Sequence, residues 1–119
     1  MSEKRNENRK DFPYYMQLTD ATTSQLVGHL ADISTGGFLL DSDKQIPVGQ
    51  ECNFNLALTE DVTDKPFITF LARSKWCRTD PTDPLVYNVG FHVLEMEPED
   101  LEIFNIVVNL YGTNKPIDK

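Results

Sequence analysis

The sequence predicts a mainly β domain: a six-stranded antiparallel β-barrel, followed by one C-terminal α-helix and preceded by a flexible basic N-terminal arm. Three observations predict this fold. Short runs of β-branched and aromatic residues recur between residues 12 and 95, with turn-forming residues between them. The spacing of apolar residues changes after residue 97, and the first ten residues are charged rather than apolar.

Six segments are expected to be strands, because each is rich in β-forming residues and is bounded by residues that favour turns. The short links between them favour an antiparallel meander, and closure into a barrel would remove its exposed edges. The expected strands are Pro13–Leu18, Gln25–Ile33, Gly37–Asp41, Glu51–Leu58, Phe67–Cys77 and Tyr87–Glu95.

A helix is expected over residues 98–111. Pro98 suits the first helical turn, and the two acidic residues after it interact favourably with the positive end of the helix dipole. Gly112 is a typical C-terminal stop. Apolar residues recur at steps of three and four, at Leu101, Phe104, Val108 and Tyr111. Four more make the apolar band wider than one barrel face needs, so we expect a monomer or a weak dimer: Ile103, Ile106, Val107 and Leu110.

The length and the charge of the chain exclude some classes of function. A chain of 119 residues can bury one hydrophobic core and is too short for a two-domain enzyme. Its formal net charge is −8 at pH 7, although the first ten residues carry four basic and two acidic side chains. An acidic body repels a long nucleic acid, whereas a short basic arm suits a small anion. On charge alone, a solvated and frayed terminus is the simpler interpretation.

The sequence shows neither a signal peptide nor a membrane anchor, because its apolar stretches are short and its first residues are charged. Cys52 and Cys77 are far apart and have no Cys or His neighbours that would complete a metal site. We therefore expect reduced thiols in a cytoplasmic protein that does not insert into a membrane.

Common catalytic patterns are absent from the sequence. It contains no Gly-x-Ser-x-Gly, His-Glu-x-x-His or Gly-x-x-x-x-Gly-Lys pattern. The two histidines, His29 and His92, fall in expected strands, where a lone histidine is more often structural or exposed than catalytic. We therefore expect no enzyme, no catalytic residue, no metal site and no cofactor.

Two short motifs carry the functional hypothesis: Arg5-x-x-x-Arg9 in the basic arm and Asp32-x-Ser34-x-x-Gly37 at a strand end. Two guanidiniums present planar donor forks to phosphate oxygens or to the O6/N7 edge of guanine. The second motif supplies a carboxylate acceptor, a hydroxyl and glycines that bring the backbone close to a ligand. Taken alone, the second motif is more typical of an ordinary turn between two strands.

Together the two motifs resemble those of the PilZ domain, a bacterial receptor module for cyclic di-GMP. Their order and the 23-residue gap from Arg9 to Asp32 match the family. The segment Val89-Gly90-Phe91-His92-Val93 is similar to a late glycine-containing strand of the family, and the expected helix resembles its closing element. The resemblance covers essentially the whole chain and implies a six-stranded barrel with a C-terminal helix.

The resemblance also implies roles for the motif residues. Arg5 and Arg9 would clamp guanine and phosphate groups of cyclic di-GMP. Asp32 and Ser34 would form hydrogen bonds with a guanine or an arginine, and Gly37 would leave room for the ligand.

Four accessory ligand-binding candidates follow from the same resemblance. Lys4 stands where the family links the residue type to whether one or two ligand molecules bind, and Gly36 belongs to the turn of the second motif. Trp76-Cys77-Arg78 is similar to a Trp-x-Arg sequence whose ring and guanidinium lie beside the ligand in single-domain members. A place for Trp76 in the hydrophobic core is the alternative.

We therefore predict a cyclic di-GMP receptor and adaptor with a ligand-binding arm over residues 1–11, a barrel with its helix over residues 12–112 and a tail over residues 113–119. Ligand binding is expected to order the arm and to signal to a downstream protein, for example in motility or biofilm regulation. Two alternatives stay open. One is a PilZ-like interaction module of pilus or motility machinery that binds no nucleotide, and the other is a different small barrel, including an enzyme or a lipid carrier.

Overall fold

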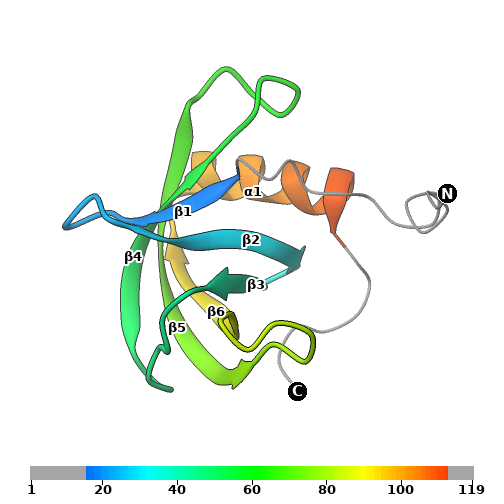
Figure 1. The fold of residues 1–119 in the computed structure, drawn as a ribbon. Helices are drawn as coiled ribbons and strands as arrows, with labels where there is room; N and C mark the ends of the chain where they lie inside the picture. Colours follow the sequence, from blue (N-terminus) through cyan, green and yellow to red (C-terminus); the bar gives the residue numbers. More distant parts are fainter. Residues whose placement is uncertain (1–15, 113–119) are drawn as a thin grey trace, which may run out of the picture.

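The computed structural model describes residues 16–112, and within this range the chain forms six strands and one helix (Figure 1). Every pair of neighbouring strands is antiparallel, and the sheet closes on itself as a barrel. The predicted fold class is therefore confirmed. The elements are β1 (Gln17–Asp20), β2 (Leu26–Ser34), β3 (Gly37–Ser42), β4 (Glu51–Ala57), β5 (Phe67–Thr79), β6 (Tyr87–Met96) and α1 (Pro98–Tyr111).

The strand order corrects the simple meander that the short links predicted. Around the barrel the order is β1-β2-β3-β6-β5-β4, so β3 pairs with β6 and β4 pairs with β1. Residues 43–50 carry the chain from β3 to β4. Ser74 of β5 stabilises this connection. Its hydroxyl donates a hydrogen bond to the carbonyl of Pro47 at 2.6 Å and accepts one from the amide N–H of Gln50 at 3.1 Å.

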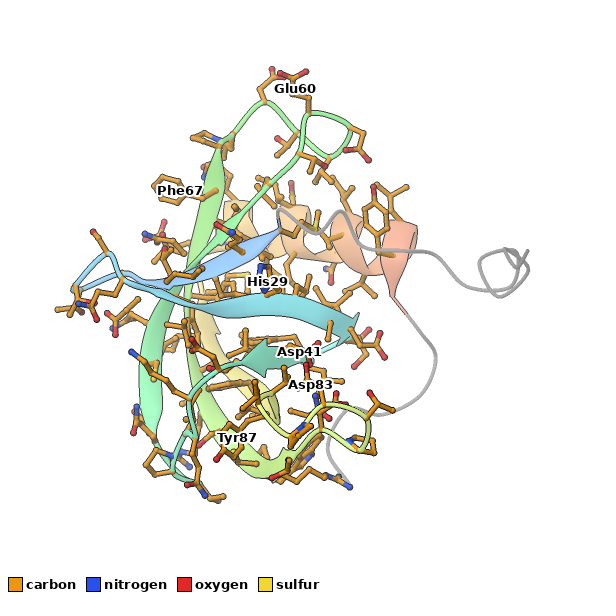
Figure 2. The ribbon with its side chains drawn as sticks, viewed as in Figure 1. His29, Asp41, Glu60, Phe67, Asp83 and Tyr87 are labelled. Carbon is orange, nitrogen blue, oxygen red and sulfur yellow. The ribbon has the colours of Figure 1, made fainter. Side chains whose placement is uncertain are left out.

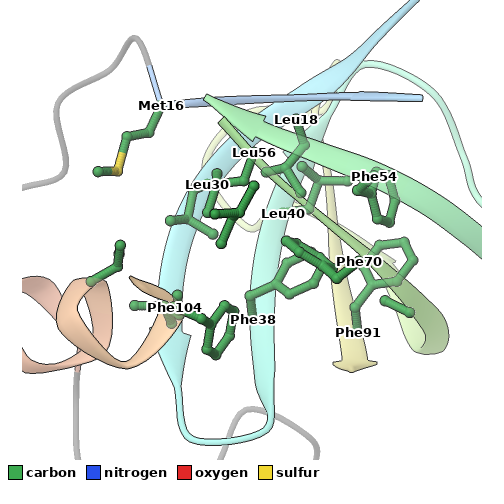
Figure 3. Packing of buried hydrophobic residues seen from close by; sticks show 14 of the residues in the cluster. Met16, Leu18, Leu30, Phe38, Leu40, Phe54, Leu56, Phe70, Phe91 and Phe104 are labelled. Atoms are coloured by element: carbon green, nitrogen blue, oxygen red, sulfur yellow. The ribbon is translucent and has the colours of Figure 1, made fainter. Parts of the chain in front are cut away.

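Aromatic side chains fill the barrel interior (Figure 3). Phe38 lies in contact with three other rings, those of Phe54, Phe70 and Phe91, at centroid distances of 5.1–5.8 Å. Edge-to-face and stacked pairs of this kind contribute about 0.5–1.5 kcal/mol each beyond the area that they bury. Phe104 of α1 adds a fifth ring, 5.9 Å from Phe70, so the helix closes the core.

The helix begins and ends where the sequence predicts, but its buried face is different. The buried residues are Ile103, Phe104 and Val107, whereas Leu101, which the periodicity assigned to this face, is 45% exposed. An apolar band this wide lets the helix pack in more than one rotation, and the barrel end selects one. Ile106 and Leu110 are also exposed.

The strand bounds agree with the predicted ones to within a few residues, except at the first strand. β1 continues to Asp20, where a turn was expected, and residues 13–15 of the predicted strand lie outside the described range. The turn forms immediately afterwards, since the Asp20 carboxylate accepts the amides of Thr22 and Thr23. In residues 16–112 no helix has the length and apolar character needed to cross a membrane.

Candidate functional site

The Asp-x-Ser-x-x-Gly motif forms the hairpin between β2 and β3. Ser34 pairs with Gly37, so Thr35 and Gly36 form a two-residue loop between the strands. Gly36 has a φ of +85°, a left-handed conformation that glycine adopts without a steric penalty. The carbonyl of Gly36 accepts the amide of Val93 at 2.8 Å, which ties the loop to β6. The motif is thus a turn held against the barrel wall.

A β-bulge turns Asp32 to the outside of the barrel. Leu30 pairs with Leu40, but Asp32 pairs with Leu39, so Ala31 is an extra residue on β2. Before the bulge Leu30 points inward, and after it the inward residue is Ile33, which is fully buried. Asp32 therefore lies half-buried on the outer face, where its carboxylate accepts the amide of Ile33 at 2.8 Å.

A second bulge does the same for Trp76. Ser74 pairs with Phe91, but Trp76 pairs with Gly90, so Lys75 is an extra residue on β5. In a regular ladder Trp76 would face Val89 and point into the core. The bulge instead places Trp76 half-buried on the outer face, which rules out the core position that the sequence left open.

These two shifts bring Asp32 and Trp76 into one row across four strands. The row runs from Asp32 through Leu39 and Gly90 to Trp76. Three steps between strands, each about 4.8 Å, separate its ends by about 14 Å along the surface. A carboxylate acceptor thus stands at one end of a strip of sheet and an indole ring at the other.

Arg78 completes the indole end of the row. Its guanidinium carbon lies 4.2 Å from the centre of the Trp76 ring, as in a cation–π contact. Such a pair contributes about 0.5–1 kcal/mol when exposed. The outer face of the guanidinium, supported by the ring beneath it, offers a flat surface on which a purine can stack. Trp76 and Arg78 therefore lie together on the outer face.

An acidic corner borders Arg78. In the adjacent row, Asn88 pairs with Arg78 on one side and with Asp41 on the other. The amide of Asn88 donates to Asp41 at 2.8 Å and to Asp80 at 3.1 Å, which joins β3 to the β5–β6 connection around Asp83 (Figure 2).

The two carboxyl groups of this corner titrate differently. Burial raises the pKa of Asp41, and the charge of Asp80 adds to the effect, although the Asn88 hydrogen bond opposes it. Hydrogen bonds from the amide and the hydroxyl of Thr82 lower the pKa of Asp80, helped by Asn88. The corner therefore keeps its negative charge mainly on Asp80, and an anionic ligand should lie away from it.

Several predicted site residues fall outside the described range. They are Lys4, Arg5 and Arg9, so the structure does not test how the arginine motif meets the hairpin. The other predicted residues share one face of the barrel around β2, β3, β6 and β5: Asp32, Ser34, Gly36, Gly37, Trp76 and Arg78.

Sequence reasoning missed the neighbours that shape this face. Gly90 lies between Leu39 and Trp76, and Asn88 lies between Asp41 and Arg78. His92, dismissed as a lone histidine, is exposed and pairs with Gly37 of the motif. A glycine inside an expected strand signals close approach of another group, and Gly90 gave that signal.

Other features of the described residues offer no competing site. No group of His, Cys, Asp or Glu side chains in residues 16–112 could hold a metal ion, and both cysteines are free thiols. A hollow of about 550 Å³ lies on β4, β5 and the end of β6. Glu95 and Glu97 line it, and it contains no predicted site residue.

The family model of the PilZ domain matches residues 3–108, which includes both motifs and nearly all of the described fold. Neither a curated protein nor a solved structure is significantly similar to the chain.

Proposed function

The chain belongs to the PilZ domain family, a family known for cyclic di-GMP receptors and not for enzymes, and we propose that this chain binds cyclic di-GMP and passes the signal to a protein partner. Most of the chain is one such domain, since the match spans 106 residues, from residue 3 to residue 108. The proposed binding residues are Arg5, Arg9, Asp32, Ser34 and Gly37, with Lys4, Gly36, Trp76 and Arg78 as accessory residues.

One observation supports this proposal most strongly: Asp32 and the Trp76–Arg78 stack lie at opposite ends of one row on the outer face. Cyclic di-GMP has two guanine bases with N–H donors and flat faces, joined through two phosphodiesters. A carboxylate accepts such donors, and a ring with a guanidinium above it stacks on a purine. The row thus offers complementary groups for two parts of the ligand.

The remaining contacts in this proposal come from the N-terminal arm. Arg5 and Arg9 of residues 1–11 would reach the phosphates and a guanine edge, where planar guanidiniums bind two acceptors at once. Ordering a residue costs about 1–2 kcal/mol, which offsets part of the gain from these contacts. The partner would recognise the surface that the arm and the barrel form together. Lys4 would decide whether one or two ligand molecules bind.

Calorimetric titration tests the proposal directly. Cyclic di-GMP is titrated into the purified protein, with GTP, GMP and cyclic di-AMP as controls. We expect saturable binding of cyclic di-GMP alone, at one or two molecules per chain, with micromolar or tighter affinity, about −8 kcal/mol or better. No heat and no thermal stabilisation at high ligand concentration would contradict the proposal and would favour an interaction module that binds no nucleotide.

Asp32→Asn tests the acceptor end of the row. The substitution keeps the size of the side chain but replaces one carboxylate oxygen by an NH₂ group that cannot accept a guanine N–H. We expect the affinity for cyclic di-GMP to fall by about 1–3 kcal/mol, or about 5- to 150-fold. Glu60→Gln is the matched control, because Glu60 is exposed in the β4–β5 loop (Figure 2) and should leave the affinity unchanged. If Asp32→Asn binds cyclic di-GMP with wild-type affinity, Asp32 is not part of the binding site.

A further inference from the structure

We propose that Gly90 is a positioning residue for Trp76: the absence of a side chain at position 90 lets the indole ring lie against β6 and fixes the height of the Trp76–Arg78 stack above the sheet. The seating of the ring is a property of the protein alone. Its effect on cyclic di-GMP rests on the proposed function.

The contact between the two residues is very close. A Cβ atom added at Gly90 would lie 2.5 Å from both Cε2 and Nε1 of Trp76 and 2.9 Å from Cζ2. All three separations are shorter than real Cβ contacts, so the ring would have to move. Gly90 itself is buried, although it belongs to the outer face, because the ring covers it.

Three glycines of the barrel show why Gly90 is a special case. Gly36 has open space around it but a φ of +85°, so its backbone conformation requires glycine. At Gly28 an added Cβ would clash with the carbonyl oxygen of Asp41, an obstacle that is part of the backbone. Gly90 has neither constraint, since its φ lies outside the left-handed region and its nearest neighbours are side-chain atoms. Its role therefore concerns one side chain.

The bulge in β5 explains why this side chain is the indole. Because Lys75 is the extra residue, Trp76 lies directly opposite Gly90, with Leu39 on the other side of the glycine. Directly paired residues on one face of a sheet have Cβ atoms about 4.5–5.5 Å apart, which leaves no room for a ring to lie flat over a second side chain. Gly90 supplies that room.

An alanine at position 90 should push the ring away from the sheet. Arg78 lies over that ring at 4.2 Å, so the guanidinium loses its contact or moves with the ring. Either change displaces the flat surface at one end of the row while Asp32 at the other end stays in place. A ligand that must meet both ends then binds less well.

The first part of the experiment needs no ligand. Trp76 is the single tryptophan of the chain, so its fluorescence reports its surroundings alone. We expect Gly90→Ala to shift the emission maximum to longer wavelength and to increase quenching by iodide, because the ring becomes more exposed. Emission and quenching equal to those of the wild type would overturn the proposal, whether or not the protein binds cyclic di-GMP.

The second part of the experiment is a double-mutant cycle that combines Gly90→Ala with Trp76→Ala. Calorimetric titration measures the affinity of each variant for cyclic di-GMP. Trp76→Ala should weaken binding by about 5- to 150-fold, the range that base–aromatic stacking explains. Gly90→Ala should also weaken binding, but adding it to Trp76→Ala should cost nothing more, since the ring through which it acts is gone. Losses that multiply in the double variant would overturn the proposal. Absence of binding in the wild type would instead refute the proposed function.

Folding of the variants is part of the same test. If Gly90→Ala alone fails to fold, the double variant Gly90→Ala/Trp76→Ala should fold as well as Trp76→Ala, because the obstacle to the new methyl group is absent. Circular dichroism and thermal melting decide this point. A double variant that also fails to fold would show that position 90 requires glycine for another reason and would overturn the proposal.

Discussion

The inner and outer faces of the β3–β6–β5 surface are built on different principles. Inside, Phe38, Phe91 and Phe70 pack ring against ring and are almost fully buried. Outside, the same strands carry a row with a glycine, whose empty position is covered by one indole ring. The interior gains stability by filling space, whereas the outer row gains a defined shape because one position is left empty. The comparison separates residues that hold the fold from residues that shape the site.

Phe38→Ala should break the inner face and gives the largest expected effect. Phe38 is fully buried and touches three other rings, so truncation leaves a cavity that the closed barrel cannot fill. We expect the free energy of unfolding to fall by about 3–5 kcal/mol, measured by urea denaturation. Its neighbour Leu39 points outward, so Leu39→Ala is the control and should cost much less. Equal losses for the two variants would contradict the assignment of inner and outer faces.

Deletion of Lys75 should leave the two faces in place. Without the extra residue, Ser74 still pairs with Phe91 and Trp76 with Gly90 in a regular ladder, so Trp76 stays outward and Cys77 inward. The strand loses the local bend and twist of the bulge, so we expect the free energy of unfolding to fall by about 0.5–3 kcal/mol while tryptophan emission stays close to that of the wild type. Urea denaturation and tryptophan emission measure the two quantities.

Lys75→Ala is the control for this deletion. It keeps the bulge and removes only an exposed side chain, so stability and emission should stay close to those of the wild type. A deletion variant whose emission shifts to shorter wavelength would show that Trp76 has turned into the core and would contradict its pairing with Gly90.

Asp41→Asn tests the cost of a charged group on the outer face and has the smallest expected effect. Burial raises the pKa of Asp41, so the folded state binds this proton more tightly than the unfolded state does. The ionised carboxylate therefore costs stability above the folded-state pKa, and the cost disappears below the unfolded-state value. We expect Asp41→Asn to raise the melting temperature at pH 7 and to have little effect near pH 3. The corresponding gain in the free energy of unfolding at pH 7 should be no more than about 1 kcal/mol.

The control for this prediction is Asp43→Asn, just after the end of β3. Asp43 is exposed, so the same loss of charge should change the melting temperature less at pH 7. A stabilisation by Asp41→Asn that is independent of pH would show that the carboxylate charge is not its cause.

Local patterns in the sequence predicted the elements well. Turn-forming residues marked the ends of the strands, and the change of period marked the helix, because both signals act between residues close in the chain. The face of the helix was predicted less well: Leu101 fitted the period but is exposed. The wide apolar band allowed several rotations, and only contact with the barrel end distinguishes them.

The candidate site was predicted as a set of residue types but not as an arrangement. The sequence motifs identified Asp32, Ser34 and Gly37, and the hairpin holds all three. Trp76 was left between a core position and a ligand-binding one, and Gly90 was noticed only as part of a glycine-containing strand. Both uncertainties have one cause, since the inward or outward direction of Trp76 depends on the single extra residue in β5.

The sequence by itself determined the number of strands, the position of the helix, the hairpin motif and the sign of the charge on each part of the chain. Tertiary structure alone decided that β3 pairs with β6, that two bulges turn Asp32 and Trp76 outward, and that the indole ring lies over Gly90. The physical reason is the range of the interactions. Turns and helices follow from neighbours in the chain, whereas a bulge is defined by the partner strand, and one extra residue reverses every side chain that follows it.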